Sequence, residues 1–344
     1  MASSIPKGDK NSDSGNYLKN VAIFGATGRS GRFIADALVK KGKHRVTVIT
    51  RPESTRSIPP GVHNVKKVQL EDYPSIVEAL KGQHALVITL SAGAAKGTEE
   101  KLMDAAVEAG VQWVMPNDWG CDETNSALMR DSEVLSRRRA EIRRHMEEAA
   151  RAAGGRTNWI GMCCGFWYEF SLAGTEARYG FDFEKKSVTF FDDGLTLTNT
   201  STWPQVGLAV ANLLSLKILP DSDDDVSPCL SRYANRFIFV SSFYLTQKDM
   251  FESVLRVTGD SRDEWKISRE PSVDRYQRGV QMVHNGQRVG FLIAAYARIF
   301  CQDGVGDFND KLDNEALGLP EESLDNATRE AVRMALAGET NAVK

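Results

Sequence analysis

The sequence of 344 residues has few cysteines, no long apolar run and little net charge, and each of these properties argues against one class of protein. The five cysteines are odd in number and include no C-x-x-C pair, so they indicate neither a disulfide framework nor a metal site. A net charge of -3 gives no electrostatic basis for binding nucleic acid or a membrane surface. No apolar run approaches the length of a membrane span, and the polar N-terminus is unlike a signal peptide. We therefore expect a cytoplasmic protein whose partner is a small molecule, and we leave its oligomeric state open.

The stretch VAIFGATGRSG, residues 21–31, predicts a strand, a tight turn and the start of a helix. Gly25, Gly28 and Gly31 follow its apolar residues at intervals of three. Glycine lets the backbone bend sharply and lets a pyrophosphate approach the main chain, and a helix start offers unpaired N–H groups. Because a second strand is predicted one helix later, at residues 44–50, we expect this turn to bind a dinucleotide.

The end of that second strand indicates which dinucleotide is bound. A carboxylate there usually binds the free 2′-hydroxyl of NAD, whereas the 2′-phosphate of NADP favours a guanidinium group. The sequence has Arg51 at this position, 20 residues after Gly31, and Arg29 lies inside the glycine turn as a second candidate. NADP is therefore favoured, and Glu53 nearby leaves NAD as the alternative.

Strands and helices alternate along the first half of the chain. Further strands are predicted at residues 65–69, 85–90, 111–115 and 157–162, and helices over residues 76–80, 102–109 and 129–153. This alternation is typical of an α/β protein with a Rossmann-type, doubly wound parallel sheet, whose ligands lie beyond the carboxyl ends of the strands.

The long helix carries an apolar stripe at Ile142, Met146, Ala149 and Ala153. Arg139 lies three residues before Ile142, so we expect it to extend this inward face toward the sheet.

An aromatic-rich segment, residues 163–170, follows the strand at 157–162, and we interpret it as a pocket wall at the same sheet edge. With Trp119 from the preceding strand exit, it supplies the candidate substrate contacts Trp119, Phe166, Trp167, Tyr168 and Glu169.

Beyond Leu172 the alternation becomes irregular. Strands are predicted at residues 188–191 and 237–240, helices over residues 206–216, 248–258 and 273–283, and an exposed acidic loop at residues 220–228. We divide the chain into a disordered tail (1–18), a nucleotide-binding domain (19–170) and a smaller α+β substrate lobe (171–344), of which some chain can return to the sheet.

The sequence resembles the NmrA-like and isoflavone-reductase-like branch of the atypical short-chain dehydrogenases over roughly residues 20–330. The motifs that carry the resemblance are GATGRSG at 25–31 with Arg51, KLMDAAVEAGV at 101–111, PNDWG at 116–120 and IRR at 142–144. The family binds NADP(H), and its reductases transfer hydride to small, often aromatic substrates held between the nucleotide-binding sheet and the C-terminal lobe.

The resemblance implies roles for individual residues. It implies pyrophosphate contacts from Gly25, Thr27, Gly28, Arg29, Ser30 and Gly31, a 2′-phosphate contact from Arg51 and an adenine neighbour in Gln69. It also implies that Ser91, Gly93, Cys163 and Cys164 lie near the nicotinamide.

One position departs from the family pattern. Reductases of this family resemble K-x-x-I-R-R at the long helix, with the lysine acting in catalysis, and this sequence has Arg139 there. A guanidinium group keeps its proton at neutral pH, so Arg139 cannot act as an ordinary general acid, although it can stabilise an oxyanion. The alternative is a buried structural ion pair. The catalytic candidates are therefore Arg139, Tyr168 and Asp118.

A Tyr-x-x-x-Lys spacing at Tyr244 and Lys248 does not replace the lysine, because Thr246 and Asp249 predict a helix-capping pair at the same place. Three functions remain as hypotheses. The first is an NADP(H)-dependent oxidoreductase that reduces a C=N or activated C=C bond of an aromatic or heterocyclic metabolite. The second is a non-redox cyclase or isomerase of secondary metabolism that holds NADP, and the third is a non-catalytic NADP-sensing regulator.

Overall fold

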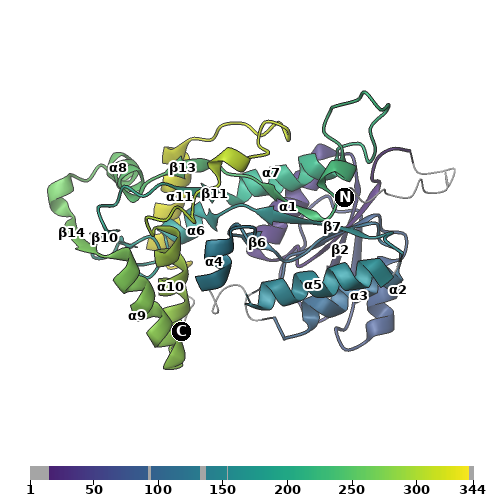
Figure 1. Ribbon diagram of the computed structural model, residues 1–344, viewed down its shortest axis with the longest axis horizontal. Coiled ribbons are helices and arrows are strands. Elements are labelled where there is room, and N and C mark those ends of the chain that lie inside the picture. The colour runs from purple at the N-terminus through teal and green to yellow at the C-terminus, as the bar shows by residue number, and fades with distance from the viewer. Residues whose placement is uncertain (1–14, 92–93, 132–136, 153, 341–344) are drawn as a thin grey trace.

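Eight parallel strands form the central sheet, in the order β12-β7-β5-β4-β1-β2-β3, with β6 also paired to β7 (Figure 1). The computed structural model describes residues 15–91, 94–131, 137–152 and 154–340, with only the backbone of residues 131 and 137–139. The strands are β1 (Asn20–Phe24), β2 (Arg45–Thr50), β3 (Asn64–Lys67), β4 (Ala85–Ile88), β5 (Trp113–Met115), β6 (Trp119–Gly120), β7 (Asn158–Cys163) and β12 (Arg236–Phe239). The predicted α/β fold with a Rossmann-type doubly wound sheet is confirmed.

Helices cover both faces of this sheet, as the alternation of side chains along each strand requires. In β1, Val21 and Ile23 pack in a core with α1 (Arg29–Lys41) and α7 (Trp203–Leu214). Ala22 and Phe24 point the other way, into a core with α2 (Tyr73–Leu80), α3 (Thr98–Glu108) and α5 (Arg137–Ala152). Figure 1 shows α1 and α7 above the sheet and α2, α3 and α5 below it.

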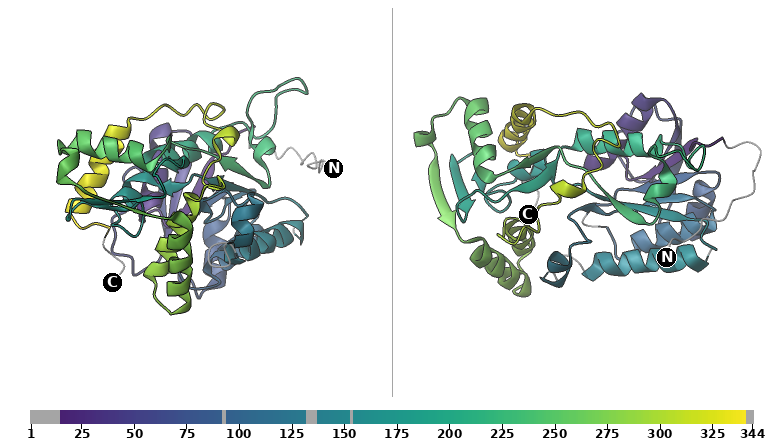
Figure 2. Two further views of the ribbon diagram at one scale, coloured as in Figure 1. Left: turned by 60° about the vertical axis from the view of Figure 1, so that its left-hand side comes forward. Right: turned by 45° about the horizontal axis from the view of Figure 1, so that its top comes forward.

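The C-terminal lobe lies beside the sheet and is built on two small three-stranded sheets (Figures 1 and 2). Its strands are β8 (Phe166–Trp167), β9 (Phe181–Asp182), β10 (Ser187–Phe191), β11 (Thr198–Ser201), β13 (Phe243–Leu245) and β14 (Lys266–Glu270). Its helices are α6 (Tyr168–Leu172), α8 (Gln247–Thr258), α9 (Ser272–His284), α10 (Val289–Ile299) and α11 (Leu324–Leu336), with short 3-10 turns η1 (Leu230–Tyr233), η2 (Arg262–Glu264) and η3 (Asn309–Lys311). An aromatic-rich third core fills the lobe.

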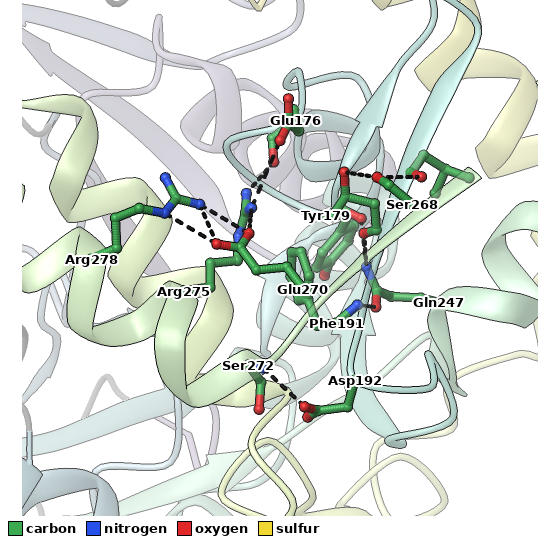
Figure 3. Close-up of polar contacts among 12 residues, drawn as sticks. Glu176, Tyr179, Phe191, Asp192, Gln247, Ser268, Glu270, Ser272, Arg275 and Arg278 are labelled. Atoms are coloured by element: carbon green, nitrogen blue, oxygen red, sulfur yellow. Dashed lines mark hydrogen bonds and ion pairs between the residues drawn. The ribbon is translucent and has the colours of Figure 1, made fainter. Parts of the chain in front are cut away.

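A buried arginine joins α9 to the lobe's outer sheet (Figure 3). The guanidinium group of Arg275 lies 2.7 Å from the carboxylate of Glu270 and 4.5 Å from the centre of the Phe191 ring. Arg278 also contacts Glu270, with an N–O distance of 2.7 Å, and the Asp192 carboxylate accepts the backbone N–H that starts α9. These contacts stabilise the lobe by hydrogen bonds to ionised groups in a largely buried place.

Two elements beyond residue 171 belong to the nucleotide-binding half. Residues 236–239 form β12, which pairs with β7 in the central sheet, and α7 packs against α1. Gly207 of α7 allows this helix to approach α1 closely, because a Cβ at Gly207 would lie 2.6 Å from the carbonyl oxygen of Phe33. The C-terminal half is therefore tied into the sheet rather than appended to its end.

Two local predictions need correction. The predicted tail is mostly outside the described residues, but Tyr17 forms a β-bridge with Lys217 and Leu18 is buried, so residues 17–18 are part of the fold. One long helix was predicted over 129–153, but the structure has two helices here, α4 (Ser126–Asp131) and α5. Residues 132–136 lie outside the described part.

The buried stripe of α5 consists of Ile142, Met146 and Ala150. Ala149, which we predicted in this stripe, is only half-buried. Ala153 lies outside the described residues.

Candidate active site

The glycine turn at the end of β1 packs directly against the exit of β4. Gly25 has a φ of +91°, and a Cβ there would lie 2.1 Å from the carbonyl oxygen of Thr89. A Cβ on Gly31 would lie 2.3 Å from the carbonyl oxygen of Gly25, so neither position accepts a side chain. Gly28 is the N-cap of α1 and has no side chain to accept a hydrogen bond from the first turn. The first N–H groups of α1 are thus available to an anion.

Arginines from separate segments converge on this turn. The guanidinium group of Arg56 lies 3.4 Å from the carbonyl oxygen of Thr27. Burial lowers the pKa of Arg29, and the nearby positive charges of Arg56 and Arg32 lower it further, while Glu339 opposes them. Mutual repulsion of this kind is relieved by a bound polyanion. Sequence reasoning missed Arg56, which lies outside the family motif, in the loop after β2.

Arg51, the predicted 2′-phosphate ligand, follows directly after β2 on the exposed edge of the site. Its Nε lies 3.3 Å from an Oε1 of Glu53, and both side chains are about 60% exposed. An exposed pair of this kind contributes little to stability, so the guanidinium group can change partner at little cost.

The remaining predicted cofactor residues lie at the same sheet edge. Thr27 and Ser30 are half-buried in the glycine turn, whereas Gln69 and Ser91 are exposed after β3 and β4. Gly93 lies outside the described residues.

Cys163 and Cys164 are completely buried. The thiol of Cys163 donates to the carbonyl oxygen of Cys121 at 3.3 Å, and burial raises its pKa. A buried thiol of raised pKa, such as that of Cys163, is unreactive. Cys163 and Cys164 pack in the cores on opposite faces of the sheet, so their predicted position near the nicotinamide stays a prediction.

The segment after β5 connects neighbouring strand exits. The side chain of Asn117 accepts a hydrogen bond from the backbone of Leu90 at 2.7 Å, and the indole N–H of Trp119 donates to the carbonyl oxygen of Ile88 at 2.9 Å. Trp119 thus packs on the core and uses its polar atom within the protein, which does not support its predicted contact with substrate.

A small cavity, partly open to solvent, lies between the sheet edge and the C-terminal lobe. Residues before 171 contribute Cys121, Asp122, Gly165 and Phe166, and residues 171–344 contribute Thr198, Asn199, Ile299, Val305, Gly306 and Phe308. Its lining is apolar with a few polar groups, as is usual for a small-molecule site. We call it the interlobe cavity.

A second small cavity lies on the α3 and α5 face of the sheet. Asp118 and Arg143 line it with Glu99, Pro116, Asn117, Ile142, Met146 and Trp159. The predicted catalytic residue Asp118 therefore lines a different cavity from Phe166.

The aromatic segment divides between the cavity and the lobe's core. Phe166 lines the interlobe cavity and stacks on Tyr296, with ring centres 4.0 Å apart. Trp167 is half-buried and packs on Trp203 at 6.3 Å. Two guanidinium groups lie over the ring of Phe170, that of Arg29 at 4.8 Å and that of Arg178 at 3.6 Å from its centre.

Two of the predicted site residues in this segment face inward. Tyr168 has no exposed surface, and its hydroxyl group lies 2.7 Å from that of Thr328. Glu169 is also buried, and one of its carboxyl oxygens has no hydrogen-bond partner among the described residues. The short helix α6 buries both side chains, and Tyr168 packs in the third core. The structure therefore does not support the predicted role of Tyr168 in catalysis or of either residue in substrate binding.

Arg139 lies in the first turn of α5, and its side chain is outside the described part of the structure. Its inward direction therefore stays a prediction. Arg143, one turn later, lies 3.4 Å from the buried carboxylate of Glu123.

The Tyr-x-x-x-Lys spacing is accounted for by local structure. Thr246 and Asp249 form the predicted capping box of α8, and the hydroxyl group of Tyr244 donates to Asp307 at 2.6 Å. In the described ranges, no cluster of His, Cys, Asp or Glu side chains has the geometry of a metal site. None of the helices described is both long and apolar enough to cross a membrane.

Comparison with known proteins agrees with the motifs in the sequence. Residues 18–157 match the NmrA-like family. The oxidoreductase aprR of Aspergillus flavus is 26% identical over 313 residues, which cover 89% of this chain and 96% of that protein. The oxidoreductase poxI of Penicillium oxalicum is 24% identical over 314 residues, covering 90% of this chain and 92% of that protein.

Solved structures agree in fold. AtPrR2 with NADP+ and (+)pinoresinol gives a TM-score of 0.69 at 18% identity, covering 92% of this chain and 99% of that one. A crystal structure of isoflavone reductase gives a TM-score of 0.66 at 16% identity, covering 91% and 99%. Residues 18–157 therefore match the NmrA-like family, and the chain has the fold of the isoflavone and pinoresinol reductases over most of its length.

Proposed function

We propose that this protein is an NADP(H)-dependent reductase of a small aromatic or heterocyclic metabolite with a polar double bond. The observation that carries the proposal is the uncapped start of α1 at the glycine turn, with Arg29, Arg32 and Arg56 around it and Arg51 exposed at the end of β2. Backbone N–H groups and guanidinium groups are the donors that a diphosphate and a 2′-phosphate require. When bound, NADPH supplies hydride.

The interlobe cavity supports the substrate class. Phe166 and Phe308 offer apolar walls to a flat ring, and Asn199 and Asp122 offer polar atoms that would orient it. We propose residues 171–344 as the main substrate-binding part, since six of the ten lining residues come from them. The related proteins named oxidoreductase, and the structures solved with NADP(H), support the same class of reaction.

The proposal gives Arg139 an electrostatic role. It does not donate a proton, because its pKa lies far above neutral pH, but its charge can stabilise negative charge that develops on the substrate.

Cofactor titrations test the proposal, with NADPH and NADH added separately and binding followed by protein fluorescence. We expect NADPH to bind more tightly, and Arg51→Ala to weaken NADPH binding about 10-fold or more while changing NADH binding little. Arg45→Ala is the matched control, because Arg45 is an exposed arginine at the opposite end of β2. Equal binding of both cofactors to the wild type, or equal effects of the two substitutions, would contradict the assignment of Arg51.

Turnover is the second part of the test. The wild-type protein with NADPH is offered a panel of cyclic imines, enones and ketones, and cofactor oxidation is followed by absorbance. Tight NADPH binding with no oxidation by any member of the panel would refute the reductase function and leave only cofactor binding.

A further inference from the structure

Two arginines, one from each half of the chain, meet over one aromatic ring beside the glycine turn. Arg29 is the first residue of α1, and Arg178 lies in the loop between α6 and β9. Their guanidinium groups lie 4.8 and 3.6 Å from the centre of the Phe170 ring. Because Arg178 is only 2% exposed, the C-terminal lobe places a buried positive charge close to the start of α1.

The hydrogen-bond acceptors that these two guanidinium groups have among the described residues are neutral carbonyl oxygens. Arg29 donates to the carbonyl oxygen of Glu339 at 2.5 Å. Arg178 donates to the carbonyl oxygens of Phe170, at 2.5 Å, and of Thr340, at 3.5 Å, which is a long contact. The Nε of Arg178 is buried and has no hydrogen-bond partner among the described residues. Part of the donor capacity of Arg178 is therefore unused.

The charge of this pair is not balanced by an adjacent carboxylate of the described residues. The carboxylate of Glu339 is paired with Arg333, at an N–O distance of 2.6 Å. Burial lowers the pKa of Arg178, Tyr296 opposes this change, and the charge of Arg29 adds to it. Buried charge without an ionised partner is costly, and an anion between two such groups would relieve their repulsion.

Gly174 leaves the space that the guanidinium group of Arg178 occupies. A Cβ at Gly174 would lie 2.1 Å from the Cδ and 2.2 Å from the Nη1 of Arg178. The φ of Gly174 is not positive, so its backbone does not require glycine. The glycine therefore serves the placement of the buried charge rather than a turn of the chain.

We propose that Arg29 and Arg178 together bind the diphosphate of the dinucleotide, so that the C-terminal lobe supplies a cofactor ligand to the glycine turn. This inference rests on the proposed function. Glu339 and Thr340 are neighbours with Cα atoms about 3.8 Å apart, so the two groups that contact their carbonyl oxygens are close enough to bind one diphosphate. Ionised phosphate oxygens form stronger hydrogen bonds with guanidinium groups than neutral carbonyl oxygens do.

The C-terminal segment competes with the diphosphate for these two arginines. The hydroxyl group of Thr340 holds the segment on the lobe by donating to the carbonyl oxygen of Ala173 at 2.6 Å, and Thr340 is 4% exposed. The carbonyl oxygens of residues 339 and 340 accept from the same guanidinium groups that the diphosphate needs. Loosening this segment should therefore tighten cofactor binding, whereas loss of Arg178 should weaken it.

Fluorescence titrations with NADP+ and with adenosine 2′-monophosphate, which has no diphosphate, test the inference. We expect Arg178→Gln to weaken NADP+ binding about 10-fold or more and to change adenosine 2′-monophosphate binding by less than about twofold. Arg269→Gln is the control, because Arg269 is an exposed arginine on β14 of the same lobe, and it should match the wild type with both ligands. Melting temperatures show that each variant is folded.

Two further variants keep the test independent of how well Arg178→Gln folds. Arg178→Lys keeps the buried charge but loses the planar fork, so we expect NADP+ binding to weaken about threefold with adenosine 2′-monophosphate binding unchanged. Thr340→Val removes the hydrogen bond to Ala173 with little change of shape, and we expect it to tighten NADP+ binding about threefold.

Equal losses of both ligands in Arg178→Gln would show that Arg178 has a structural role and would overturn the inference. Wild-type NADP+ affinity in Arg178→Gln and Arg178→Lys would also overturn it, as would NADP+ binding by Thr340→Val that is no tighter than that of the wild type. Each of these results leaves the proposed function intact. Wild-type protein that binds neither NADP+ nor NADPH would overturn the inference and the proposed function together.

Discussion

Glu169 gives this protein a pH-dependent stability that a single substitution can remove. Burial raises the pKa of the Glu169 carboxyl to about 8, and the negative charges of Glu322 and Glu330 add to the shift. Backbone N–H groups, including that of Trp203, oppose it only in part. One carboxyl oxygen has no hydrogen-bond partner among the described residues, so the ionised form has little to compensate its burial.

The sign and size of the effect follow from proton linkage. In the unfolded chain Glu169 ionises near its ordinary pKa of 4.5, whereas the folded protein keeps the proton up to about pH 8. The folded state therefore binds more protons in this window, so the stabilising contribution is complete below pH 4.5 and is lost as the pH rises toward 8. Each pKa unit corresponds to about 1.4 kcal/mol, so about 3 kcal/mol of unfolding free energy is lost between pH 5 and pH 8.

Urea unfolding of Glu169→Gln at pH 5 and pH 8, followed by tryptophan fluorescence, measures this loss. The glutamine is neutral at both pH values, so we expect its unfolding free energy to fall by about 3 kcal/mol less than that of the wild type. Glu321→Gln removes an exposed carboxylate of the same region and should follow the wild type. Parallel pH dependence of Glu169→Gln and the wild type would refute the reasoning.

Two further substitutions test contacts described above. Gly207→Ala should lower the melting temperature, because overpacking against the carbonyl oxygen of Phe33 costs about 1–3 kcal/mol. This cost exceeds the ~1 kcal/mol by which alanine stabilises an exposed helix relative to glycine. A higher melting temperature would contradict the close contact of α7 with α1. Tyr244→Phe removes the hydrogen bond to Asp307 and should cost about 1 kcal/mol of stability while leaving turnover within twofold. A tenfold loss of turnover in a stable Tyr244→Phe protein would restore the Tyr-x-x-x-Lys pair as a catalytic candidate.

The first half of the fold could be predicted because its signals are local. Strands such as β1 are apolar runs, and helices such as α1 have an apolar stripe. The glycine turn needs glycine because a side chain at Gly25 or Gly31 would clash with nearby backbone. The pairing of residues 236–239 with β7 in the central sheet could not be predicted, because the sequence of a four-residue strand does not indicate which strand it pairs with.

The aromatic segment shows why predicting side-chain direction failed. Residues 163–170 were interpreted as one wall, but the chain changes from β8 to α6 after Trp167. Phe166 consequently lines the interlobe cavity while Tyr168 is buried in the lobe.

The α1 helix links the glycine turn to the C-terminal lobe. Its start carries the glycine turn, its middle packs against α7, and Arg29 in its first turn contacts both Phe170 and the carbonyl oxygen of Glu339 near the C-terminus. A phosphate that binds at the start of α1 would compete for the same guanidinium group that holds the end of the chain. Cofactor binding and the packing of the C-terminal lobe are therefore expected to influence each other through Arg29, even though the glycine turn is more than three hundred residues away from Glu339.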